Sequence, residues 1–232
     1  MIASGWLFAP ASLASPSSRS AAAKNTNFAG YRRNGGGSTA SFNIRASFVV
    51  PKLTGCTAAS RAIAPDIDVS NGTTSGHSGV GLFVGCYKGK PDYFPFILVN
   101  GSNTDYAAGT VQPGDHISLH LSEGPSSADV TFQDLTHNLV KVKTGPGRKD
   151  LGFPGIGVDS WFIKDVELGV PDFGRVLFSH CTVNGAALGA GGSPKAPAVL
   201  EYDRATKAGT LQIATGALTA GKQAFATYFK HS

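Results

Sequence analysis

The sequence predicts an all-β protein, a sandwich of two large antiparallel sheets. Three observations support this fold class. Short segments rich in β-branched and aromatic residues recur along the chain, and several of them alternate apolar and polar residues. Turn-forming residues separate these segments, consistent with 30 glycines and 13 prolines. Methionine occurs once, and no segment sustains the 3.6-residue period of an amphipathic helix.

The predicted strands follow one another at short intervals, as in sandwiches and jelly rolls. Turn signals lie between them, such as Pro113-Gly114-Asp115 and Asn184-Gly185, where the chain is expected to reverse direction. The predicted strands are residues 41–50, 117–121, 130–132, 140–142, 161–166, 176–183, 199–202 and 224–229.

Residues 1–24 differ from the rest of the chain. Residues 5–14 are apolar, and Ser12-Leu13-Ala14 resembles a small-x-small cleavage site, with Ser- and Ala-rich sequence after it. This pattern is typical of the end of a secretory signal peptide. We therefore predict a leader or signal-peptide remnant over 1–24, one β-sandwich domain over 25–232, and a secreted protein.

Composition excludes several classes of function. The net charge is +5, but the longest basic runs are the pairs Arg32-Arg33 and Arg148-Lys149, so a nucleic-acid partner is not expected. No run approaches the ~18 apolar residues of a membrane span. The stretch 216–222 imitates a phosphate loop, but Gln223 follows where Ser or Thr is needed. His116 and His120 would lie about 13 Å apart on a strand, too far to share a metal ion. We predict no cofactor, no metal and a monomer.

Several motifs together resemble the eqolisins, a family of glutamic peptidases. The segment NFAGY at 27–31 is similar to the family's NWAGY opening, and ASFVVP at 46–51 to its first long strand. The turn VQPGDHI at 111–117 and the blocks WFIKD at 161–165 and PDFGRVLF at 171–178 follow in the family's order. The resemblance implies a concanavalin A-like jelly roll whose concave face forms a substrate groove. It also implies a disulfide between Cys56 and Cys86, with Cys181 free.

The two residues that carry the family's chemistry are substituted. In that family a Glu acts as general base on a water, and a Gln orients the water and stabilises the oxyanion. The resemblance places Ser160 at the Glu position and His77 at the Gln position. A second register of the Gln strand would place Val99 there. Asp159 is adjacent to Ser160, and on a strand it is expected to point to the opposite face, away from the groove.

The substitutions predict a protein that has lost glutamic endopeptidase activity and binds an extended peptide or a glycan in its groove. One alternative is an active hydrolase in which Ser160 is the nucleophile, His77 its base and Asp68 the support for His77. The other is a glutamic-type endopeptidase whose site lies elsewhere on the chain. That site would draw on Gln112, Gln133, Gln212 or Gln223.

Overall fold

The computed structural model describes residues 22–33, 41–56, 61–70, 77–163, 166–193, 196–197 and 199–231. These residues form twenty strands and no helix, which confirms the predicted all-β fold class. Within the described ranges, no helix is long and apolar enough to cross a membrane. Most of the predicted leader lies outside these ranges. Its last residues, Ala23 and Lys24, begin the short strand β1 (Ala23–Asn25), which pairs in parallel with β18 (Val199–Ala205).

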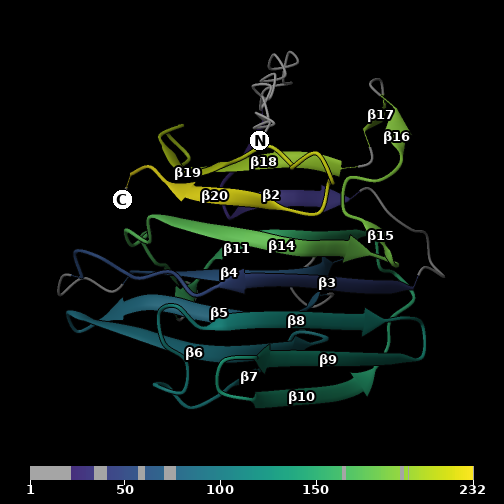
Figure 1. Cartoon of the computed structure of the whole chain (residues 1–232), viewed down its shortest axis with the longest axis horizontal. Helices are drawn as coiled ribbons and strands as arrows, with labels where there is room; N and C mark the ends of the chain where they lie inside the picture. Colours follow the sequence, from purple (N-terminus) through teal and green to yellow (C-terminus); the bar gives the residue numbers. More distant parts are fainter. Residues whose placement is uncertain are drawn as a thin grey trace, which may run out of the picture.

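The strands form two layers, seen one behind the other in Figure 1. The front layer contains, in spatial order, β10 (Leu139–Pro146), β9 (Ser127–Asp134), β8 (His116–Glu123), β3 (Phe42–Val49), β14 (Arg175–Val183) and β20 (Phe225–Phe229). The back layer contains β2 (Phe28–Arg33), β11 (Phe153–Ser160), β4 (Arg61–Ser70), β5 (His77–Tyr87), β6 (Lys90–Val99) and β7 (Ser102–Asp105). Strands β19 (Leu211–Thr215) and β18 join the layers, so the hydrogen-bonded path is continuous.

Short strands complete the structure. β15 (Ala186–Ala187) pairs with β14, and two small hairpins stand apart from the main path. The hairpins are β12 (Phe162–Ile163) with β13 (Val166–Glu167), and β16 (Gly192–Ser193) with β17 (Ala196–Pro197).

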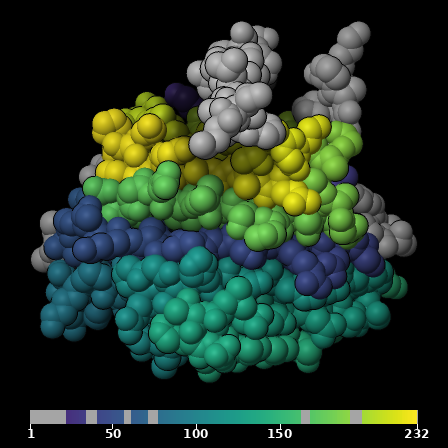
Figure 2. All heavy atoms as spheres, in the orientation of Figure 1, coloured from purple at the N-terminus to yellow at the C-terminus, as the bar shows by residue number. Residues whose placement is uncertain are grey.

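The core lies between the two layers and follows from the alternation of the front strands. In β3, Phe42, Ile44, Ala46 and Phe48 are buried, whereas the residues between them face outward. Neighbouring strands of the front layer run side by side across the molecule, visible in Figure 2 as bands of green, blue and teal atoms. Strands β4 and β5 differ, because nearly all their residues are buried on both faces.

A disulfide links the end of β5 to the loop after β3. Cys56 and Cys86 are bonded, with Cα atoms 5.4 Å apart, and Cys181 is a buried free thiol. The predicted pairing is therefore confirmed. The bond ties the loop that precedes β4 to the end of β5.

Candidate functional site

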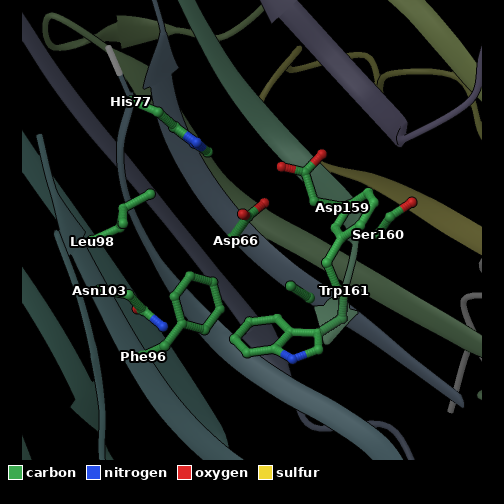
Figure 3. Close-up of a pocket in the computed structure, with 10 residues that line it drawn as sticks. Asp66, His77, Phe96, Leu98, Asn103, Asp159, Ser160 and Trp161 are labelled. Atoms are coloured by element: carbon green, nitrogen blue, oxygen red, sulfur yellow. The ribbon is translucent and has the colours of Figure 1, made fainter. Parts of the chain in front are cut away.

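Two adjoining pockets open on the outer face of the back layer, over β2, β11, β4, β5 and β6. Their volumes are about 250 and 560 Å³, and both are lined by His77, Asp159, Ser160 and Phe162. We call the two together the groove, the smaller the apolar pocket and the larger the polar pocket. Figure 3 shows the apolar pocket, with the side chains of Asp66, His77 and Asp159 directed into one space.

The strand register explains why charged side chains meet here. Residues paired across strands point to the same face of a sheet. Arg32 is paired with Gly155, and Gly155 with Asp68, so these three form a row across β2, β11 and β4. A Cβ atom on Gly155 would overlap Oδ1 of Asp68. The missing side chain lets Arg32 reach across the middle strand to Asp68.

A second row places Asp66 between two glycines, Gly157 of β11 and Gly81 of β5. A Cβ on Gly81 would crowd both the Asp66 side chain and the ring of Phe96. Asp66 is therefore seated on the groove floor with backbone on either side, and only 3% of it is exposed. Its Oδ1 atom is buried and has no hydrogen-bond partner among the described residues.

Asp68 is the ionised carboxylate of the groove. Arg32 Nη1 donates a hydrogen bond of 2.8 Å to Asp68 Oδ2, and the same guanidinium stacks 4.2 Å from the ring of Phe28. Burial alone would raise the pKa of Asp68, but Arg32 and His77 outweigh it and lower that pKa to about 2. His77 Nε2 lies 3.4 Å from Asp68 Oδ2. Burial opposes charging of His77, yet Asp68 raises its pKa above the ordinary value.

Asp66 and Asp159 have the opposite character. Asp159 is paired with Ala64 and Asp66 with Gly157, so the two carboxyl groups are diagonal neighbours on one face of β11 and β4. Burial, followed by the charge of Asp68, raises the pKa of Asp159 to about 6. Burial, followed by the charges of Asp159 and Asp68, raises the pKa of Asp66 well above its usual range. Both shifts favour the protonated carboxyl form over the ionised form, as expected for two neighbouring buried carboxyl groups.

Among the residues that the structure describes, two clusters have ligand atoms close enough together for a cation to be considered. Asp68, His77 and Asp159 form one, but Arg32 already supplies positive charge to Asp68 there. The other lies on the front layer, where Asp134 accepts hydrogen bonds from the backbone of Thr136 and His137, and Asp115 accepts one from Gln112. Hydrogen bonds from turn backbone groups and the contacts with His137 explain why these two carboxylates lie close together. Neither cluster requires a metal to explain its arrangement.

Phe96 and Trp161 line one wall of the apolar pocket and belong to a cluster of four packed rings. The rings of Phe83 and Phe94 stack with centroids 4.3 Å apart. Trp161 meets Phe83 and Phe96 edge-on, each at 5.1 Å, and Phe94 at 5.9 Å. The mutual packing of four rings holds the wall in one arrangement. A large apolar side chain entering the pocket would contact rings that are already fixed.

The predicted site residues fall into two groups. His77 and Asp68 lie together in the groove, near one another. The hydroxyl of Ser160 instead accepts a hydrogen bond of 2.9 Å from Nε of Arg204, a buried contact. In Figure 3 the Ser160 hydroxyl points away from the space that Asp66 and His77 share. Val99, which the second register would place at the Gln position, is buried in the core.

The face of Asp159 is the main difference from the sequence prediction. The resemblance gave the groove position to Ser160 and the far face to Asp159, but both residues line the two pockets, and the Asp159 carboxyl group lies in the groove. Adjacent strand residues point to opposite faces, and Ser160, the last residue of β11, directs its hydroxyl to Arg204. Asp159 pairs with Phe28 and Ala64, which also face outward.

Sequence reasoning also missed Asp66 and Arg32. The pattern that marks Asp66 is Asp-x-Asp in one strand, with Gly79-x-Gly81 in the next strand and Gly155-x-Gly157 in a distant one. Acidic residues at alternate positions of a buried strand can lie against the backbone of the neighbouring strands when those strands have glycines opposite them. The sequence alone does not show that Gly155 and Asp68 are neighbours, because 87 residues separate them.

Comparison with known proteins extends this description. No protein-family model matches the chain, and no curated protein sequence matches it. A solved structure of scytalido-glutamic peptidase with a transition-state analog inhibitor superimposes with a TM-score of 0.66, at 12% identity, over 88% of this chain and 98% of that one. The chain has the fold of the eqolisin peptidases. SCP-B, an eqolisin in complex with the tripeptide Ala-Ile-His, superimposes with a TM-score of 0.63, also at 12% identity, over the same shares. Identity this low shows the fold alone.

Proposed function

We propose that the protein is a secreted hydrolase that cleaves peptide bonds of extended peptides in the groove, with Asp159 as general base. The observation that carries this proposal is the position of Asp159, a partly exposed carboxylate at the junction of the two pockets. A general base works best when its pKa lies near the working pH, and burial raises that of Asp159 to about 6. Perturbed carboxyl groups in a cleft are a recognised mark of catalytic sites.

The reaction follows from the groups present. The Asp159 carboxylate takes a proton from a water molecule, whose oxygen attacks the carbonyl carbon of the peptide bond. The C–N bond then breaks, and Asp159 returns the proton to the departing amine. Asp68, which is ion-paired with Arg32, lies beside His77 and raises the pKa of its imidazole, which favours the charged form although Arg32 itself opposes that charge. That charge stabilises negative charge developing on the substrate.

The shape of the groove and its structural neighbours support a peptide substrate. The solved neighbours bind peptide-based inhibitors or a tripeptide, and this chain shares their fold. The apolar pocket, with its wall of Phe96 and Trp161, suits an aromatic or large aliphatic side chain. The polar pocket, with Asn25, Asn27 and Ser70, suits the backbone and polar side chains on the other side of the cleaved bond.

A second candidate function is binding of the same peptides without cleavage. It is favoured by one observation, that no Gln or Glu is found among the described residues lining the two pockets. Gln112, Gln133, Gln212 and Gln223 all lie outside these linings. In this case the aromatic wall would supply affinity and the carboxyl groups would only orient the peptide.

Extracellular location is part of the proposal. The Cys56–Cys86 disulfide supports it, because such bonds persist mainly in oxidising compartments. Sequencing the N-terminus of the protein recovered from culture medium tests this point. A mature chain that begins near residue 15 is expected, and retention of the whole chain inside the cell would contradict secretion.

Incubation of the protein with a mixture of synthetic peptides, read by mass spectrometry between pH 4 and 8, tests the function. New termini are expected next to large apolar residues, above about pH 6. A fluorophosphonate is not expected to inhibit cleavage or label Ser160, because that hydroxyl is buried against Arg204. Peptide binding without new termini would contradict the hydrolase and support binding without cleavage. Labelling of Ser160 would instead favour a hydrolase with Ser160 as its nucleophile.

A further inference from the structure

We propose, on the basis of the proposed function, that the carboxyl group of Asp66 donates the hydrogen bond that stabilises the oxyanion formed during cleavage. Its side chain lines the apolar pocket, and its Oδ1 atom is buried without a partner among the described residues. A buried polar atom without a partner costs free energy unless something bound completes its hydrogen bonding. A carbonyl oxygen of a peptide in the pocket is such a partner.

Asp66 lies beside Asp159, the proposed general base, on the same face of the sheet. Asp66 and Asp159 are diagonal neighbours across β4 and β11, so their Cβ atoms lie roughly 7 Å apart or less. A carbonyl carbon held between them would have the water of Asp159 on one side and the Asp66 carboxyl group near its oxygen. Figure 3 shows the two side chains directed into the same space.

Only a protonated carboxyl group donates a hydrogen bond, and the surroundings of Asp66 favour that form. The charged groups that face it are Asp159 of β11, Asp68 of its own strand, Arg32 of β2 and His77 of β5. Burial and the two carboxylates raise its pKa, and Arg32 opposes them without overcoming them. As the proton moves from water to Asp159, the carbonyl π pair moves to oxygen, and Asp66 O–H shares its proton with that oxygen. When the C–N bond breaks, the pair returns and Asp66 keeps its proton.

Asp66→Asn and Asp66→Ala separate this role from a structural one. An Asn amide donates a hydrogen bond at every pH, whereas Ala donates none. We expect Asp66→Ala to lower kcat by about 100–1,000-fold with little change in KM. Asp66→Asn is expected to keep kcat within about 10-fold of the wild-type value. Near-ultraviolet circular dichroism verifies that both variants are folded. Equal kcat values for Asp66→Ala and wild type would overturn the proposal, as would an Asp66→Asn variant that is no more active than Asp66→Ala.

A second measurement does not depend on cleavage. The infrared carbonyl stretch of a protonated carboxyl group is expected in the wild-type protein at pH 7, and its loss in Asp66→Asn assigns it. If this band is present but no peptide is cleaved, the hydrolase proposal fails while the protonated donor remains. If the band is absent at pH 7, the proposal for Asp66 is wrong whether or not the protein cleaves peptides.

Discussion

Gly155 leaves open the space through which Arg32 reaches Asp68. A Cβ atom at this position would overlap Asp68 Oδ1 and would lie 3.1 Å from Nη1 of Arg32. A glycine in the middle strand is therefore a condition for an ion pair between the two strands beside it. The position of His77 depends in turn on this gap, because His77 Nε2 lies 3.4 Å from the Asp68 oxygen that Arg32 holds.

The first prediction concerns Gly155→Ala. The added methyl group should separate Arg32 from Asp68 and reduce the free energy of unfolding by about 1–3 kcal/mol. Urea denaturation measures the change. Gly221→Ala is the matched control, since a Cβ there meets nothing within 4 Å. Equal stability of Gly155→Ala and the control would show that Asp68 tolerates displacement and that the gap is not required.

Replacement of Arg32 tests the ion pair directly. Asp68 has a folded pKa of about 2, below its unfolded value, so its ionisation contributes stability above about pH 4 that is lost as pH falls toward 2. Arg32→Met removes the main group that lowers this pKa and leaves His77 as the other. Above pH 4 we expect the free energy of unfolding of the variant to be about 2–4 kcal/mol below that of the wild type. This difference should shrink in more acidic solution. The exposed Arg175 gives the control, Arg175→Met, which should change little. A deficit independent of pH would mean that Arg32 contributes by packing on Phe28 instead.

The strand pattern and the disulfide were within reach of the sequence, whereas the composition of the site was not. Alternation in segments such as Phe42–Val49 reports which face meets the core, and it depends only on neighbours along the chain. The groove depends on which strands lie side by side. Asp66 and Asp159 are brought together by the pairing of β4 with β11, which no local pattern encodes. The resemblance placed Asp159 on the far face, whereas its carboxyl group lies in the groove.

The disulfide provides a separate test of stability. Cys56 and Cys86 close a loop with a sequence separation of 30, so Cys56→Ser with Cys86→Ser should lower the free energy of unfolding by about 3–4 kcal/mol. Thermal denaturation of the double variant and of the wild type, with and without reductant, measures this. Reductant should destabilise only the wild type. Thiol titration of the unfolded wild type should find one free thiol, Cys181, and three thiols would refute the bond.

Specificity is predicted to depend on the aromatic wall. Trp161→Ala removes a ring that contacts Phe83, Phe94 and Phe96, and should raise KM or Kd about 10-fold or more for a peptide with Phe in the apolar pocket. For the same peptide with Ala at that position, the increase in KM or Kd should be much smaller. Tyr87→Ala, at an exposed site on the same layer, serves as the control. Equal losses for the Phe and Ala peptides would mean that Trp161 only supports the fold of the pocket.

The pH dependence of kcat/KM for one cleaved peptide tests the role of Asp159 most directly. Asp159 must be ionised to accept a proton, so the rate should rise as pH increases through about 6. It should fall again at higher pH as Asp66 and His77 lose their protons. Asp159→Asn, which preserves shape but accepts no proton, should lower kcat/KM by about 100–10,000-fold and abolish the rise. An Asp159→Asn variant with the rate and pH profile of the wild type would contradict the account.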